Sequence, residues 1–347
     1  MDICYFLGAN TRSGFRSLYD GFCSGPDDYL YIIKGGPGGG KSSFMRTIGE
    51  AASRRGYDVE YVVCSGDPDS LDGVYIPQKH VGFVDGTAPH VIEPRNIGAD
   101  SFYVNLGCFC SCEIAWYDAR RITELTAEYR AHYARAYKWL GAAGCVAEAP
   151  IAGAYTPEAL EKARSRAASS VRREAHGIHR THRTGRVTKR FLSAISGSGD
   201  VELYCGLNEA YTHIYGLDNR LGLAVPYLEA AMAEAGELGI DVIFCPCPLN
   251  PETPEAILLP ELGVMFTTKF TGEPYRHVRL DALGDIGGVR RELRQKEAIY
   301  GALMGEARSA LADAKLAHDA LEGVYRPYMN FEGLTRYTLD TIEALFV

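Results

Sequence analysis

The chain repeats itself once along its 347 residues. The segment 56–64 (GYDVEYVVC) returns as the segment 239–247 (GIDVIFCPC), at an offset of 183 residues (239 − 56). FLGA at 6–9 returns as FLSA at 191–194, now 185 residues later (191 − 6), so two residues were gained or lost in between. The offset of 183 also holds for Pro68 and Pro251, Pro77 and Pro260, Val81 and Val264, and Phe83 and Phe266. A duplication of this length predicts two related structural units.

Each copy alternates apolar strands with a helix. The strands are expected at residues 4–8, 29–33, 58–64 and 81–84 in the first copy, and at 191–195, 211–215, 241–245 and 264–267 in the second. Alternation of this kind favours a parallel sheet joined by right-handed crossovers. We therefore predict an α/β protein of two tandem parallel-sheet units, 1–188 and 189–347.

A long helical region follows each predicted sheet. In the first copy, apolar residues at mostly three-to-five-residue spacing mark a helix over about 113–140. Thr156 and Pro157 suit the N-cap and the first turn of a second helix. The second copy offers helices at 289–321 and 328–346. We expect each pair to form a helical hairpin, so that about 113–175 makes an arm of the first unit. The apolar stripes of these helices are interpreted as packing faces, and a protein partner or self-association through the arms is left open.

The first copy carries a glycine-rich loop, GGPGGGKS, from Gly35 to Ser42. It fits the pattern G-x-x-x-x-G-K-[ST] and lies between a predicted strand and a predicted helix, the context that this phosphate-binding motif requires. Glycines allow the backbone to turn its N–H groups towards phosphate oxygens, and the helix adds the positive end of its dipole. The loop therefore predicts a site for a nucleoside triphosphate, ATP with Mg²⁺. The candidate binding residues are Gly35, Gly36, Pro37, Gly38, Gly39, Gly40, Lys41, Ser42 and Ser43.

The side chains of this site can be given individual roles. Lys41 is expected to bridge the β- and γ-phosphates, the Ser42 hydroxyl to coordinate Mg²⁺, and Ser43 to reach the α-phosphate. Asp85 ends the apolar strand VGFVD, the pattern of a carboxylate that positions magnesium at the C-terminal end of a strand. Lys41 and Asp85 are thus candidate catalytic residues, and Ser42 and Asp85 are candidate metal ligands.

No motif identifies the catalytic base, because Gly86 rather than a glutamate follows Asp85. Carboxylates cluster just after the preceding predicted strand, in the segment DPDSLD, and Asp67 and Asp72 of this segment are candidate catalytic residues. The alternative is that the segment only turns the chain, with its carboxylates capping backbone amides. Asp69 of the same segment is a weaker candidate. Thr87 and His90, just past Asp85, are candidates for sensing or polarising the γ-phosphate.

The second copy lacks this chemistry. GLDNRLG at 216–222 stands where the first copy has its glycine-rich loop; it contains no lysine, and Asp218 would repel a phosphate. Asp85 corresponds to Thr268 at the offset of 183 (268 − 85). We expect the second copy to keep the fold without a working triphosphate site, and to stabilise, cover or regulate the first.

Composition narrows the range of partners. A net charge of −8 disfavours wholesale nucleic-acid binding, and no run of about 18 apolar residues could span a bilayer. The N-terminal sequence lacks the basic and apolar segments of a secretory signal, so a cytoplasmic location is expected. A basic stretch over 172–190 joins the copies and is interpreted as an exposed linker or helix end. An arginine finger, or a contact with nucleic acid or an acidic protein, is left open for it.

Ten cysteines are expected to be reduced thiols in such a compartment. Two clusters stand out, Cys108, Cys110 and Cys112, and Cys245 and Cys247. A metal site is the alternative for them, but their one-residue spacers differ from the spacing of common zinc sites. Structural cysteines are the favoured interpretation.

Several longer segments together resemble a known family. They are FLGANT at 6–11 with Gly14 and Phe15, IKGGPG at 33–38, CSGDPDSLDG at 64–73 with Ile76 and Pro77, and VDGTAPH at 84–90. These segments are similar to those of bacterial duplicated P-loop ATPases, and the resemblance extends over nearly the whole chain. It implies two P-loop NTPase-like units and a cytoplasmic ATP-binding protein. This chain departs from the family in the broken second loop, so cooperation between two nucleotide sites is not expected.

The leading hypothesis is an Mg²⁺-dependent ATPase with one nucleotide site, in the first copy, whose hydrolysis moves the helical hairpins or the inert copy. A small-molecule phosphotransferase, with the loop from Asp67 to Asp72 orienting an acceptor hydroxyl, is the first alternative. A nucleotide-gated binding module with little turnover is the second. GTP is less expected than ATP, because the chain has no Asn-Lys-x-Asp guanine signature.

Overall fold

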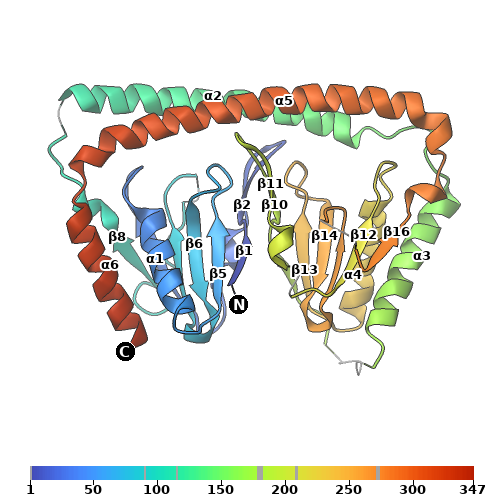
Figure 1. Ribbon diagram of the computed structural model, residues 1–347, viewed down its shortest axis with the longest axis horizontal. Coiled ribbons are helices and arrows are strands. Elements are labelled where there is room, and N and C mark those ends of the chain that lie inside the picture. The colour runs from blue at the N-terminus through green and yellow to red at the C-terminus, as the bar shows by residue number, and fades with distance from the viewer. Residues whose placement is uncertain (1, 90, 115, 178–182, 208–209, 271–273) are drawn as a thin grey trace. The chain divides into compact units, whose positions relative to one another are not determined.

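The computed structural model describes residues 2–89, 91–114, 116–177, 183–207, 210–270 and 274–347 (Figure 1). The chain is mixed α/β and forms two compact units. The first comprises Met1–Lys138, Ala194–Val201 and Glu306–Val347; the second comprises Trp139–Ser193 and Glu202–Gly305. The units are therefore interleaved along the sequence, which differs from the consecutive division at residue 188 expected from the repeat.

The first unit is built on a six-stranded sheet in the order β1-β5-β6-β7-β4-β8. Its strands are β1 (Asp2–Tyr5), β4 (Tyr29–Lys34), β5 (Val59–Val63), β6 (Leu71–Ile76), β7 (Val81–Asp85) and β8 (Ser101–Asn105). The expectation of a parallel sheet is wrong in one strand, because β6 runs antiparallel to both β5 and β7. The seven residues between β5 and β6 make a direct return possible, whereas a parallel neighbour would need a crossover.

Two helices complete the first unit: α1 (Lys41–Ser53) packs on the sheet, and α6 (Phe331–Phe346) packs on α1. Helix α1 buries Phe44, Met45 and Ile48. Helix α6 packs beside α1, where the rings of Phe44 and Tyr337 stack with centroids 6.0 Å apart (Figure 1). The last helix of the chain therefore completes the unit that contains the first strands.

The second unit repeats this plan in a six-stranded sheet with the order β16-β12-β15-β14-β13-β9. Its strands are β9 (Val187–Lys189), β12 (His213–Leu217), β13 (Val242–Pro246), β14 (Pro254–Leu259), β15 (Val264–Thr267) and β16 (Arg276–Val278). Strand β14 is antiparallel to β13 and β15, as β6 is in the first unit. The shared exception supports the duplication read from the sequence.

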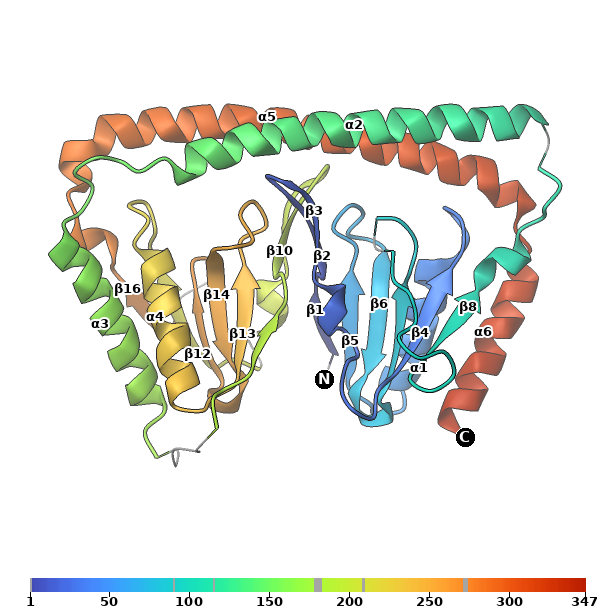
Figure 2. The same cartoon turned by 180° about the vertical axis from the view of Figure 1, so that it is seen from behind.

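Helix α3 (Pro157–Glu174) packs against α4 (Ala224–Glu237) in the second unit (Figure 2). Buried Ala163, Ala167 and Val171 of α3 share a core with Tyr227 and Leu228 of α4. The helix predicted as part of the first unit's arm thus belongs to the second unit. Its small residues allow close contact with α4, which explains the pairing.

The long helices α2 (Trp116–Glu148) and α5 (Ile286–Tyr325) each contribute to both units. Within the first unit they contact each other directly: Arg135 pairs with Asp313, and the rings of Tyr129 and His318 lie 5.5 Å apart. The expected hairpin of 113–140 with the following helix is therefore replaced by contacts of α2 with α5 and of α3 with α4.

Short elements complete the fold. Two hairpins, β2 (Gly8–Thr11) with β3 (Gly14–Ser17) and β10 (Ser193–Ser196) with β11 (Gly199–Glu202), form separate two-stranded sheets. The 3₁₀ helices are η1 (Tyr19–Gly21), η2 (Pro77–Lys79), η3 (Leu106–Phe109), η4 (Tyr204–Leu207), η5 (Pro260–Leu262), η6 (Asp281–Leu283) and η7 (Arg326–Tyr328). Among the described residues, no helix has the length and apolar character needed to cross a membrane.

Candidate functional site

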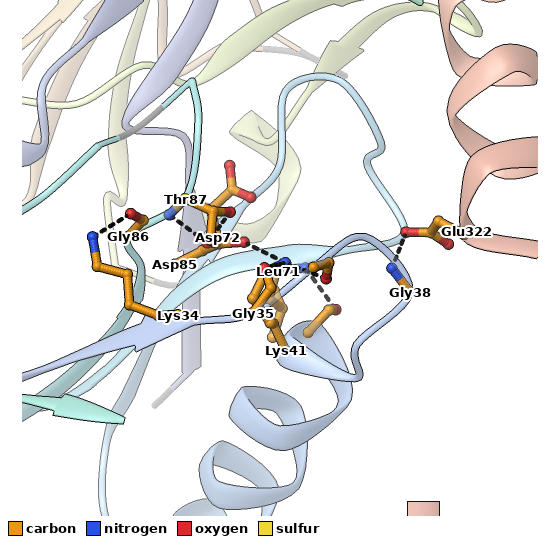
Figure 3. A network of polar contacts seen from close by, with 12 residues as sticks. Lys34, Gly35, Gly38, Lys41, Leu71, Asp72, Asp85, Gly86, Thr87 and Glu322 are labelled. Carbon is orange, nitrogen blue, oxygen red and sulfur yellow. Dashed lines mark hydrogen bonds and ion pairs between the residues drawn. The ribbon is translucent and has the colours of Figure 1, made fainter. Parts of the chain in front are cut away.

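The glycine-rich loop joins the end of β4 to the start of α1 in the first unit (Figure 3). Gly38 and Gly40 adopt φ values of +64° and +78°, in the left-handed region that other residues rarely occupy. Gly40 is the N-cap of α1, so the helix begins at Lys41. The N–H groups of the first turn have no carbonyl partner within the helix, which makes this end of α1 suited to an anion.

Lys41 folds back over the loop. Its Nζ donates to the carbonyl oxygens of Gly35 at 3.0 Å and Gly36 at 2.9 Å, and lies 3.6 Å from Oδ2 of Asp85. The Lys41 and Asp85 side chains are only 13% and 14% exposed, so this ion pair is shielded from solvent. The Lys41 ammonium group thus lies beside the loop and contacts two carbonyl oxygens, which the oxygens of a phosphate could replace.

Asp85 reaches the same place from the neighbouring strand. Strand β7 pairs in parallel with β4, and Asp85 lies opposite Ile33, two residues before the loop begins. Oδ1 of Asp85 accepts hydrogen bonds from the backbone N–H of Thr87 at 2.9 Å and from its hydroxyl at 2.6 Å. These bonds orient the carboxylate, and they bring Thr87 to the site. The other proposed γ-phosphate sensor, His90, lies outside the described residues.

Ser42 and Asp85 supply the oxygen atoms that Mg²⁺ prefers. Ser42 Oγ accepts a hydrogen bond of 2.9 Å from the backbone N–H of Leu71, the first residue of β6. Ser42 therefore ties α1 to β6 and keeps lone-pair capacity for a second partner. The Ser42 hydroxyl and the Asp85 carboxylate are therefore compatible with a magnesium ion. Ser43, the other serine of the motif, is exposed on the first turn of α1.

The carboxylates of the segment 67–72 have different surroundings. Asp67 accepts a hydrogen bond from Ser70 Oγ at 2.9 Å and lies 3.6 Å from Lys315 Nζ, so it both caps a turn and binds α5. Asp72 is not in the loop but in β6, where it is 5% exposed and accepts a hydrogen bond from Tyr19 OH at 3.1 Å. The arrangement favours the turn interpretation for Asp67 and a buried structural contact for Asp72.

The second unit contains the counterpart of the Asp72 contact. Glu255 lies 183 residues after Asp72 (255 − 72), and Tyr204 lies 185 after Tyr19 (204 − 19). Tyr204 OH donates to Oε1 of Glu255 at 2.9 Å, and the Ser193 hydroxyl donates to the same oxygen at 2.5 Å. Burial raises the pKa of Glu255 to about 7 and holds the pKa of both tyrosines well above the usual value. A buried tyrosine–carboxyl pair kept in the copy without the lysine points to a role in the fold.

The degenerate loop of the second unit is closed by a carboxylate from its own unit. Asp281 accepts hydrogen bonds from the backbone N–H groups of Leu221 at 3.1 Å and Arg220 at 3.3 Å. Asp281 is 7% exposed, and burial raises its pKa. Asp218 accepts in turn from the N–H groups of Leu280 and Asp281. Two N–H groups of this loop, those of Arg220 and Leu221, therefore already have a carboxyl partner.

Comparison with protein-family models, with curated proteins and with solved structures finds no match to this chain.

The motif did not predict that residues of α5 lie at the site. Helix α5 contacts the glycine-rich loop, where its Glu322 accepts a hydrogen bond of 3.2 Å from the Gly38 N–H (Figure 3). Glu322 is 284 residues from Gly38 along the chain. The only sequence signal was the apolar periodicity of 289–321, which indicates a helix but not its partner.

The remaining candidates are the basic stretch and the two cysteine clusters. Arg172 forms a two-pronged pair with Glu234, at 2.7 and 2.6 Å, and Arg173 donates to Tyr215; both contacts are within the second unit. Residues 178–182 of the basic stretch lie outside the described part of the chain. In the part that is described, neither cysteine cluster forms a group of three metal-ligating atoms, and the nine cysteines whose side chains are described are free thiols.

Proposed function

We propose that the first unit binds ATP with Mg²⁺ at the loop from Gly35 to Ser43. The observation that supports this most is the convergence of three features on one point. They are a glycine loop in left-handed turns, the N-terminal end of α1, and the Lys41 ammonium beside Asp85. Each of them favours an anion or its counter-ion, and their spacing in sequence is that of a phosphate-binding loop. A cytoplasmic location is part of the same proposal.

The residues of the chain have separate tasks in this proposal. Backbone N–H groups of the loop and of the first turn of α1 hold the phosphates, and Lys41 Nζ exchanges its carbonyl contacts for β- and γ-phosphate oxygens. Ser42 Oγ and Asp85 hold the magnesium ion, which neutralises phosphate charge when bound. Thr87 keeps Asp85 oriented through its two hydrogen bonds.

We further propose that bound ATP is hydrolysed. A water oxygen bonds to the γ-phosphorus while the bond to the β–γ bridging oxygen breaks, so that ADP, inorganic phosphate and a proton are released. A nucleotide-gated module with little turnover is the second candidate, and the contact of α5 with the loop favours it. For phosphoryl transfer to a small molecule, the contacts of Asp67 and Asp72 offer less support, because both carboxylates already serve the fold.

Isothermal calorimetry with MgATP tests the binding proposal. Lys41→Ala removes two charge-assisted contacts and is expected to weaken binding about 100-fold or more, or ~3 kcal/mol. Arg220→Ala, in the corresponding loop of the second unit, is the matched control and should bind as the wild type does. Equal losses in both variants would show that the copies were assigned wrongly. Phosphate release by the wild-type protein then separates the ATPase from the gated module.

A further inference from the structure

The glycine-rich loop already holds a carboxylate of its own chain. The Gly38 N–H donates to Oε1 of Glu322 at 3.2 Å, and Gly38 belongs to the segment expected to face phosphate oxygens. A carboxylate oxygen resembles a phosphate oxygen in charge and in hydrogen-bonding capacity. Glu322 therefore occupies a position that an anionic ligand of the loop would take.

The contact is part of a broad cover made by α5 and α6. A β-carbon added at Gly38 would lie 3.1 Å from Glu322 Cβ, and one added at Gly40 would lie 2.5 Å from Cδ2 of Leu334 on α6. At Gly36, the added atom would meet the ring of Tyr325, the last residue of α5, at 3.8 Å. The glycines thus allow a close approach of the two helices, in addition to their turn geometry. The cover and the loop belong to the same unit.

The two units hold their internal carboxylates differently. In the second unit Asp281 is 7% exposed and accepts two backbone N–H groups, so it is built into the fold. In the first unit the Glu322 side chain is 44% exposed and accepts the one N–H of Gly38, with His318 3.8 Å away. A single half-exposed contact is weak and can be exchanged for a ligand with several charged contacts.

We propose that Glu322 is an internal competitor of the nucleotide phosphates, so that triphosphate binding displaces its carboxylate and releases the end of α5 from the loop. This inference rests on the proposed function, since it concerns the same site. Triphosphate binding would thereby act on α5, a helix whose residues belong to both units. ATP would bind the released state better than the covered one, which is the condition for a ligand to shift such an equilibrium.

Removing the negative charge of Glu322 should change the affinity of the loop for a triphosphate by a measurable factor. The groups around Glu322 on α5 are His318 and Asp319, with Lys315 paired to Asp319 and to Asp67. Glu322→Gln keeps the size of the side chain and removes one negative charge from beside the bound phosphates. Repulsion between unit charges a few ångströms apart at a solvated site corresponds to about a five- to tenfold change in affinity. We expect the variant to bind MgATP and Mg-tripolyphosphate more tightly by this factor.

The experiment compares wild type, Glu322→Gln and Glu332→Gln by calorimetry, with MgATP, Mg-tripolyphosphate and adenosine. Glu332 lies on α6, is exposed and pairs only with Arg336 among the contacts described, so its variant controls for the change in net charge. Glu332→Gln should leave all affinities unchanged, and adenosine should not distinguish the three proteins. Hydrogen exchange at residues 315–325 of wild type should become faster when MgATP is added.

Two outcomes overturn the inference and are distinguishable from failure of the proposed function. If wild type binds MgATP but Glu322→Gln binds it equally or more weakly, Glu322 is not a competitor. If MgATP binds without faster exchange at the end of α5, the helix is not released. If folded wild-type protein shows no binding of MgATP, the proposed function and this inference both fail.

Discussion

Replacing Glu255 with glutamine is expected to remove a pH dependence from the stability of the second unit. Glu255 lies on β14 and accepts hydrogen bonds from Ser193 and Tyr204. Burial raises its pKa from 4.5 to about 7, the hydrogen bonds opposing the shift only in part. Between these two values the folded protein keeps a proton that the unfolded chain releases.

The direction and size of the effect follow from proton linkage. Because the folded state binds more protons, the free energy of unfolding falls as pH rises from about 4.5 to about 7, and it is constant above that range. The difference in pKa corresponds to about 3 kcal/mol of stability that is present at pH 4.5 and lost at pH 8. A glutamine cannot ionise, so the variant should show no such loss.

Hydrogen exchange of the β14 amides measures this stability within the second unit, after correction for the intrinsic effect of pH on exchange. Wild type should lose about 2.5 kcal/mol of protection between pH 5 and pH 8, and Glu255→Gln should lose almost none. Glu237→Gln, an exposed position on α4, is the control and should follow wild type. Equal pH dependence in wild type and Glu255→Gln would refute the conclusion that this carboxyl is neutral in the folded protein.

Two further substitutions test the two loops. Gly40→Ala places a side chain at a φ of +78° and against Leu334, so the first unit should lose roughly 1–3 kcal/mol in chemical denaturation, and MgATP binding should weaken; unchanged values would refute the need for glycine. Asp281→Ala leaves the N–H groups of Arg220 and Leu221 without their acceptor, so the second unit should lose about 2–4 kcal/mol. MgATP binding by the first unit should be unaffected by Asp281→Ala, and parallel losses at both loops would contradict the assignment.

The sequence alone determined the features that depend on local chemistry. The strand VGFVD was placed within one residue of β7, and Thr156 is the N-cap of α3, accepting from the Ala159 N–H at 3.3 Å. The glycine-rich loop lies between a strand and a helix as its motif requires. These features were readable because strand periodicity, capping and left-handed turns act over a few neighbouring residues.

The order of the strands and the partners of the helices were decided only by the tertiary structure. Nothing in LDGVYI, the sequence of β6, shows that this strand runs antiparallel to its neighbours. The direction of a strand is set by the strands beside it and not by its own residues. The apolar stripes of α3 and α6 fit several partners equally well, and the chain uses them in the unit opposite to the one that the repeat suggests. The contact of Glu322 with Gly38 follows from that exchange. It joins residues far apart in sequence, which a local pattern cannot encode.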